Sequence, residues 1–228
     1  MKLTTTTMVT VDGVMQGLGG PQEDPSGGFE RGGWVSHAFD DQAMTFLNQV
    51  YGRADAFLFG RRTYQLFAGS WGTWPDPGGN PIWTALNTKP KYVASTTLTD
   101  PRWANTTVLS GDLAAAVGEL RAKPAGELQV HGSGALVRWL LAHQLVDELT
   151  LVVCPVVVGQ GRRLFPDTGP DLALELVASR STNGGVTIQG YRPTGHPQIV
   201  AQPGDRRSRT RGSEMTNRSE SSRRCPPA

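Results

Sequence analysis

Residues 56–64 read Ala-Phe-Leu-Phe-Gly-Arg-Arg-Thr-Tyr, an apolar run followed directly by two arginines. The apolar run predicts a short buried strand over 55–59, and residues 61–68 have the pattern of a helix. The first turn of a helix carries unpaired backbone N–H groups and a partial positive charge, and a guanidinium adds parallel donors for a phosphate. This junction therefore predicts an anion site, and a ligand with phosphates is the first candidate.

A second junction of the same kind, at residues 130–134, reads Val-His-Gly-Ser-Gly. It ends a predicted strand over 127–131 and opens a helix with apolar residues at helical spacing. The small residues let the backbone approach a pyrophosphate closely, although a plain tight turn remains the alternative because the rest of the Rossmann fingerprint is missing. Two such junctions in one sheet indicate a nucleotide lying across the carboxyl ends of neighbouring strands.

Strand-like and helix-like segments alternate along most of the chain. Further strands are expected over residues 3–11, 91–95, 106–109 and 147–158, and further helices over 39–51, 81–86 and, capped by Ser110, 113–120. Residues 172–179 and 185–191 have the pattern of an antiparallel pair around Asn183-Gly184. The order predicts an α/β protein with a mixed, mostly parallel sheet, helices on both faces and a C-terminal antiparallel hairpin.

Composition divides the chain into one main domain, residues 1–194, and a tail, residues 195–228. The tail is rich in Arg, Ser and Pro and is expected to be disordered, because it cannot bury enough apolar surface to offset its ordering entropy. Seven arginines against three acids give residues 205–224 a charge of +4, so the whole-chain charge of +2 leaves the remainder at −2. The near-neutral body shows no Lys/Arg stripe, and no nucleic-acid partner is expected.

The two cysteines, Cys154 and Cys225, allow neither a disulfide framework nor a thiolate metal site, and no metal is expected. The start of the chain has Thr-rich alternation instead of a signal peptide, and no run of about 18 apolar residues predicts a membrane span. We therefore expect a cytoplasmic protein with no membrane partner.

Several segments together resemble the dihydrofolate reductase superfamily, and within it most closely the RibD C-terminal type, the reductase domain of riboflavin biosynthesis. The resemblance covers roughly Lys2 to Arg192 in the family's order and spacing. The segments that carry it are residues 60–64, 91–98, 131–134, 145–149 and 155–165.

The resemblance implies the three-layer fold of that superfamily and an NADPH-dependent hydride transfer to a small-molecule substrate. It assigns cofactor phosphates to the first helix start, the adenosine 2′-phosphate side to the serine-threonine strand end, and the pyrophosphate to the glycine turn. The residues carried over are, in that order, Gly60, Arg61, Arg62 and Thr63; Ser95, Thr96 and Thr97; and Gly132, Ser133 and Gly134. Family members often have Arg at the position of Thr96, so a preference for NADPH over NADH rests here on Arg61 and Arg62.

Catalytic candidates are Asp40 and Asp41, which sit about where dihydrofolate reductases proper place an acid for the pterin. The alternative is that both acids simply suit the start of a helix. The long loop over 17–33 is expected to cover the substrate, and Trp71, Trp74 and Trp83 are expected either to wall a planar ring or to cover a core.

The implied activity is reduction of 5-amino-6-(5-phosphoribosylamino)uracil, the pyrimidine ribosylamine of riboflavin synthesis. Dihydrofolate reduction is the enzyme alternative, and a non-catalytic nucleotide-binding module is the alternative of another class. The resemblance also implies a homodimer, for which the apolar strand over 149–158 is a candidate contact.

Overall fold

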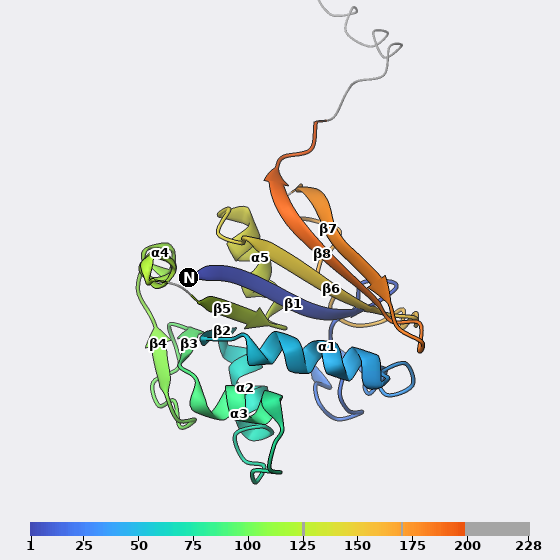
Figure 1. The fold of residues 1–228 in the computed structure, drawn as a ribbon, viewed down its shortest axis with the longest axis horizontal. Coiled ribbons are helices and arrows are strands. Elements are labelled where there is room, and N and C mark those ends of the chain that lie inside the picture. Colours follow the sequence, from blue (N-terminus) through green and yellow to red (C-terminus); the bar gives the residue numbers. More distant parts are fainter. Residues whose placement is uncertain (125, 170, 199–228) are drawn as a thin grey trace, which may run out of the picture. The chain divides into compact units, whose positions relative to one another are not determined.

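The computed structural model describes residues 1–124, 126–169 and 171–198. Its centre is an eight-stranded sheet in the order β4-β3-β2-β5-β1-β6-β8-β7 (Figure 1). The strands are β1 (Lys2–Thr10), β2 (Ala56–Gly60), β3 (Lys91–Ala94), β4 (Thr106–Leu109), β5 (Glu127–His131), β6 (Glu148–Cys154), β7 (Ala173–Ser181) and β8 (Thr187–Gly195). In the sheet order from β4 to β6, neighbouring strands are parallel. Strand β8 is antiparallel to both of its neighbours, β6 and β7. The predicted mixed sheet with a closing hairpin is therefore confirmed.

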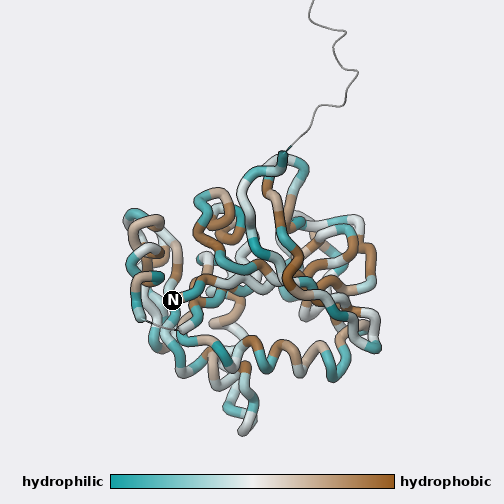
Figure 2. Tube along the Cα trace, turned by 45° about the horizontal axis from the view of Figure 1, so that its top comes forward, coloured by the Kyte–Doolittle hydropathy of each residue, from teal (hydrophilic) through white to brown (hydrophobic). Residues whose placement is uncertain are grey.

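Helices cover both faces of this sheet, as predicted. They are α1 (Asp41–Gly52), α2 (Arg61–Gly69), α3 (Pro81–Thr88), α4 (Leu113–Ala122) and α5 (Gly134–Ala142). Figure 2 shows apolar and polar residues alternating along α1. Ala43, Val50 and Tyr51 of this helix are buried, and Tyr51 packs in the same cluster as residues of β2.

Strand β2 shows how both faces are filled. Phe57 and Phe59 pack with residues of α1, α2 and α3, whereas Ala56 and Leu58 pack with residues of α4 and α5. A strand covered on both faces reads as a continuous apolar run, which is why this segment stands out in the sequence.

The order of the strands brings the two strand-to-helix junctions to the same edge of the sheet. After β1 the chain passes to β2 and outward to β3 and β4, and then returns to place β5 between β2 and β1. Ala56 pairs with Leu128 and Phe57 with Gln129, so the carboxyl ends of β2 and β5 are neighbours. The two glycine-containing junctions of the sequence follow these two ends.

Two local expectations were wrong. The side chain that caps α4 is that of Asp112, which accepts a hydrogen bond from the Ala115 N–H, and not that of Ser110. Strand β6 ends at Cys154 because Pro155 follows and has no N–H for the ladder. The loop over 17–33, expected from the sequence, is present and includes a short 3-10 turn at Ser26–Gly28.

The apolar strand expected as a dimer contact is β6, which lies inside the sheet. Strand β6 is an interior strand that pairs with β1 on one side and β8 on the other, so neither of its edges is open. Exposed apolar side chains lie instead on the outer strand β7, at Leu174, Leu176 and Val177.

Strand β8 ends at Gly195, next to the expected domain end. The expected disordered tail lies, from residue 199 on, outside the described residues, and so does Cys225.

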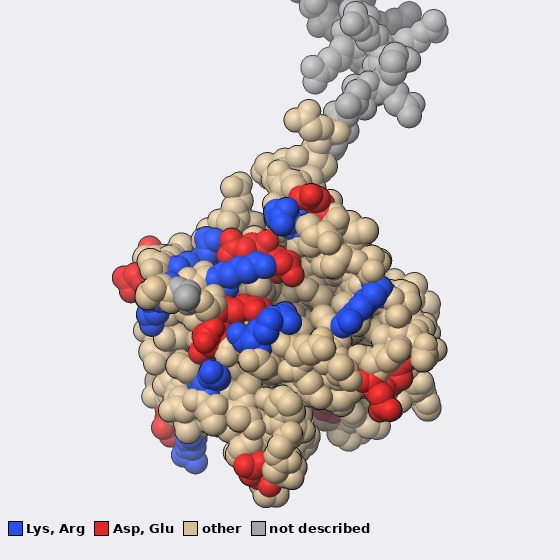
Figure 3. Space-filling model, in the orientation of Figure 1, with Lys and Arg blue, Asp and Glu red and all other residues tan. Residues whose placement is uncertain are grey.

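Within the described part of the chain, no helix has the length and apolar character needed to cross a membrane. On the face in Figure 3, basic and acidic side chains lie beside one another and form no stripe of one sign.

Candidate functional site

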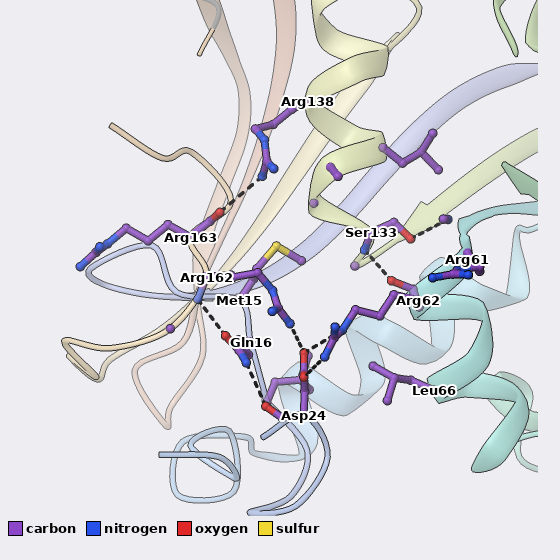
Figure 4. Close-up of a pocket in the computed structure, with 18 of the residues that line it drawn as sticks. Met15, Gln16, Asp24, Arg61, Arg62, Leu66, Ser133, Arg138, Arg162 and Arg163 are labelled. Carbon is purple, nitrogen blue, oxygen red and sulfur yellow. Dashed lines mark hydrogen bonds and ion pairs between the residues drawn. The ribbon is translucent and has the colours of Figure 1, made fainter. Parts of the chain in front are cut away.

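The two junctions predicted from the sequence are joined to each other by hydrogen bonds. The Gly60 N–H donates to Ser133 Oγ at 3.0 Å, and the Ser133 N–H donates to Thr63 Oγ1 at 3.0 Å. Helix α2 therefore begins beside helix α5, and Ser133 holds the two starts in a fixed relation (Figure 4).

Both helix starts leave backbone donors available. Among the described residues, neither N-cap residue, Gly60 or Ser133, caps its helix with a side-chain hydrogen bond. The first N–H groups of a helix lack partners inside the helix, and the dipole makes that end partly positive. Two uncapped starts that face the same space form a site that can accept an anion.

The turn before α5 has a backbone that few residues adopt. Gly132 has φ +58° and Ser133 has φ +49°, both in the left-handed region. Glycine adopts this region without cost, but serine does not, so its conformation is strained by about 1 kcal/mol or more. Ser133 gains from the hydrogen bonds to Gly60 and Thr63, which offset this strain.

A cavity of about 700 Å³ opens in front of both helix starts. Its lining includes Gly60, the first turn of α2, the turn Gly132–Gly134 and the first turn of α5. Five arginines line it, together with three acids; they are Arg61, Arg62, Arg138, Arg162 and Arg163, and Glu23, Asp24 and Asp167. The structure thus brings together seven of the ten predicted cofactor residues around one cationic cavity.

The other three predicted residues, Ser95, Thr96 and Thr97, do not line this cavity but follow Ala94, which does. Arg61 Nη1 donates to Thr97 Oγ1 at 2.8 Å, so the strand end after β3 is tied to the start of α2. Ser95 Oγ accepts from the backbone N–H groups of Thr97 and Leu98, which shapes the turn. Thr96 is exposed.

Arg62 is engaged by a carboxylate that the sequence did not single out. Arg62 and Arg162 both donate to the carboxylate of Asp24 (Figure 4). Both also donate to Ser26 Oγ. Asp24 is only 6% exposed. Burial alone raises the pKa of Asp24, but hydrogen bonds from Ser26 and Arg62 and the charge of Arg162 outweigh burial and lower it.

Gln16 completes this cluster. Its Nε2 donates to the carbonyls of Asp24 and Ser26, each at 2.9 Å, and its Oε1 accepts from the Arg162 N–H at 3.0 Å. The cluster therefore fastens the loop over 17–33 to α2 and to the segment after β6. Its members come from three distant parts of the chain, so no local pattern announces it.

A second cavity, of about 850 Å³, adjoins the first. Six residues line both, namely Met15, Leu18, Glu23, Leu66, Phe67 and Gly132. The second cavity is mostly apolar and is walled by α1, the end of α2, the loop over 18–23 and the aromatic side chains of Trp71 and Trp74. Trp83, the third tryptophan considered from the sequence, does not line it but donates its Nε1 hydrogen to the Trp74 carbonyl.

His131 lies at the base of this second cavity. Its ring stacks on Tyr51 with centroids 4.1 Å apart and planes 13° apart, and its Nε2 is 2.9 Å from Gln129 Oε1. Burial lowers the pKa of His131 to about 3 and raises the pKa of Tyr51, so both side chains are neutral near pH 7.

Asp40 and Asp41, the catalytic candidates, are not brought to either cavity. Asp40 caps α1 by accepting from the Ala43 N–H at 2.9 Å, and it also accepts from the Gly184 N–H at 2.6 Å. Asp41 is exposed in the first turn of the same helix. Their placement fits the helix-start alternative.

Comparisons with known proteins agree with this architecture. The model of the RibD C-terminal domain family matches residues 1–188. The chain is 29% identical over 197 residues to the uncharacterized protein YyaP of Bacillus subtilis strain 168, covering 82% of this chain and 92% of that protein.

Two solved structures share the fold. A putative riboflavin biosynthesis protein from Shewanella sp. PV-4 has a TM-score of 0.61 and 21% identity, over 85% of this chain and 99% of that chain. A pyrimidine reductase-like protein from Corynebacterium diphtheriae has a TM-score of 0.58 and 16% identity, over 84% of this chain and 91% of that chain.

An open α/β sheet with uncapped helix starts at the carboxyl ends of neighbouring strands is an arrangement that binds nucleotides in many proteins. The family match is more specific, because it spans more than half of the chain. The chain belongs to the RibD C-terminal domain family.

Proposed function

We propose that this protein is an NADPH-dependent reductase that transfers a hydride to a small heterocyclic substrate. The observation that carries the proposal is the pair of uncapped helix starts, tied together by Ser133, that open on a cationic cavity beside an apolar one. The cationic cavity suits the phosphates of a dinucleotide, and the apolar one suits a ring. Bound NADPH would supply the hydride from its nicotinamide.

The residues present fit this cofactor. Backbone N–H groups at the starts of α2 and α5 would hold the pyrophosphate, and Gly132 keeps the turn small enough for close approach. Arg61 is exposed at the cavity edge and, besides the donor that engages Thr97, has further guanidinium donors for the 2′-phosphate. Arg62, in contrast, is paired with Asp24. NADPH preference is therefore proposed to rest mainly on Arg61.

The nicotinamide would lie where the two cavities adjoin. Met15, Leu18 and Leu66 line this passage together with Glu23, and the three apolar side chains would limit the access of water to the reacting carbon. Within the second cavity, Glu23 is the only lining side chain that ordinarily carries a charge. It accepts a hydrogen bond from the Gly19 N–H in the same loop. No described side chain of this cavity is placed as an evident proton donor, and we propose that water supplies the proton.

Titration with NADPH and NADH tests the cofactor assignment. The purified protein should bind NADPH more tightly, and Arg61→Ala should weaken NADPH about tenfold while changing NADH little. Arg53→Ala is the matched control, because Arg53 is an exposed arginine paired with Glu127 at the opposite end of β2. Equal affinity for both nucleotides, or an effect of Arg53→Ala as large as that of Arg61→Ala, would refute the assignment.

Two substrates come first in an activity screen. The ribosylaminopyrimidine of riboflavin synthesis is implied by the family, and dihydrofolate by the wider superfamily. NADPH oxidation with either would establish the enzyme. If the protein binds NADPH tightly but no tested substrate supports NADPH oxidation, it would instead be a nucleotide-binding module. This is the second class of function left open by the sequence.

We also propose that the protein pairs as a homodimer through strand β7. Its outer edge has no partner strand among the described residues, and it exposes Leu176 at 54% and Val177 at 40%. Long exposed edge strands with apolar side chains favour pairing with another chain. Light scattering should give a dimer for the native protein and a monomer for Leu176→Lys; a native monomer at micromolar concentration would refute the pairing.

A further inference from the structure

The second cavity differs from the first in charge. The described residues that line it include no Lys, no Arg and one acid, Glu23, whereas five arginines and three acids line the first cavity. Two of those five, Arg62 and Arg162, already engage the carboxylate of Asp24. The cations at this end of the sheet are therefore arranged around the proposed cofactor cavity and not around the substrate cavity.

Neutral groups replace cations at the base of the second cavity. Gln129 Nε2 donates to the Val50 carbonyl at 2.6 Å, which directs Gln129 Oε1 toward His131 and assigns the imidazole proton to Nε2. Because its pKa is lowered to about 3, His131 adds no positive charge near pH 7. Thr6, which pairs with His131 across the parallel strands, adds a hydroxyl that can donate or accept.

The walls of this cavity suit a flat apolar ligand. Trp71 and Trp74 lie with ring centroids 5.1 Å apart, and Trp74 is 53% exposed at the cavity. An indole left this exposed has a large uncovered face, which a planar ring can cover by stacking. A phosphate dianion buried among these groups would lose its hydration without gaining a cation, which is strongly unfavourable.

We infer that the substrate is an uncharged planar ring compound with small polar substituents and no phosphate, bound in the second cavity between Trp74 and His131. This inference rests on the proposed function. In the reaction, the hydride forms a C–H bond at a C=N or C=O carbon, and the π electron pair moves to the nitrogen or oxygen. That atom takes a proton from water, and NADPH is oxidised to NADP⁺. The phosphorylated ribosylaminopyrimidine is then not the preferred substrate.

Calorimetric titration of the NADP⁺-loaded protein with two matched pairs of probes tests the inference. One pair is the ribosylaminopyrimidine with and without its 5′-phosphate; the other is 1,4-naphthoquinone and its 2-sulfonate. The uncharged member should bind at least tenfold more tightly in each pair that binds. Equal or tighter binding of the charged member in either pair, or no binding by any of the four, would overturn the inference.

Two variants locate the binding and separate this inference from the proposed function. Trp74→Ala should weaken the uncharged probe at least fivefold and leave NADPH binding unchanged. Phe165→Ala, which removes an exposed aromatic side chain outside both cavities, should leave both unchanged. A protein that binds NADPH but prefers the phosphorylated probe keeps the proposed function and loses the inference. A protein that binds the uncharged ring but not NADPH loses the proposed function.

Discussion

Substituting Asp24 by asparagine should destabilise the protein strongly, because Asp24 joins three distant segments. The Asp24 carboxylate accepts hydrogen bonds from Arg62, Arg162 and Ser26, and Asp24 is only 6% exposed. Asparagine keeps one acceptor oxygen and turns an N–H₂ group toward the arginines. About two charge-assisted hydrogen bonds are lost, each contributing about 1.5–3 kcal/mol.

The lower end of that range applies. The side chains of Arg62 and Arg162 are 54% and 49% exposed and regain water when the carboxylate is removed. Two bonds at about 1.5 kcal/mol each give an expected loss of about 3 kcal/mol in the free energy of unfolding at pH 7. Asp100→Asn is the matched control, since its ion pair with Arg102 is exposed, and it should cost less than about 0.5 kcal/mol.

Urea unfolding at a series of pH values measures the effect. The pKa of Asp24 is lowered in the folded protein, so its carboxylate contributes stability above the unfolded value near 4 and loses it as pH falls further. The gap between the native protein and Asp24→Asn should therefore be full at pH 7 and narrow below about pH 4. A loss under 1 kcal/mol at pH 7, or a gap that does not change with pH, would refute the role given to this cluster.

Three further outcomes are expected. Ser133→Ala should lower the free energy of unfolding by about 1 kcal/mol in urea titrations, because the Gly60 N–H loses its acceptor; no change would argue against that bond. Gly134→Ala should raise the Kd for NADPH about tenfold with little change in Tm, because the new Cβ would lie 2.5 Å from Met15 Sδ and push that side chain into the passage; unchanged affinity would contradict this. Although burial raises the pKa of Asp12, hydrogen bonds outweigh it and lower the pKa to about 2, so the native protein should lose stability between about pH 4 and pH 2 relative to Asp12→Asn; parallel pH curves would count against it.

The sequence predicted the position of the two junctions well, and the reason is geometric. Parallel strands end at the same edge of a sheet, so residues that follow two buried strands are brought to one edge whatever their separation along the chain. Gly60 and Ser133 are 73 positions apart and still meet through a hydrogen bond. The apolar runs before them were sufficient to place both.

The Asp24 cluster could not be predicted in the same way. Its carboxylate lies in a loop, and Arg162 follows it by 138 positions in another loop. Loop conformations depend on turn residues and on tertiary contacts, and neither segment has a repeating apolar pattern that would fix its position. The sequence therefore indicates only a phosphate-binding role for Arg62, although the fold pairs it with the carboxylate of Asp24.

Asp40 illustrates a different limit. A carboxylate at a helix start fits both a capping role and a catalytic one, because the N–H groups that it accepts from are present in every helix. What separates the two roles is whether a ligand cavity reaches the side chain, and here neither cavity does. The packing of α1 on the sheet determines this, and the sequence around Asp40 does not.

The distribution of charge along the cleft also follows from three-dimensional placement and not from composition. The whole chain has a formal charge of +2, and this value hides the fact that arginines from α2, α5 and the segment after β6 gather at one cavity. The adjoining cavity takes its lining from β1, α1 and the tryptophan loop, which supply hydroxyl, imidazole and aromatic groups. The phosphates of a cofactor would bind in the arginine-lined cavity, and a substrate without phosphate would bind in the adjoining one. The difference in charge between the two cavities therefore supports NADPH binding and also argues against a phosphorylated substrate.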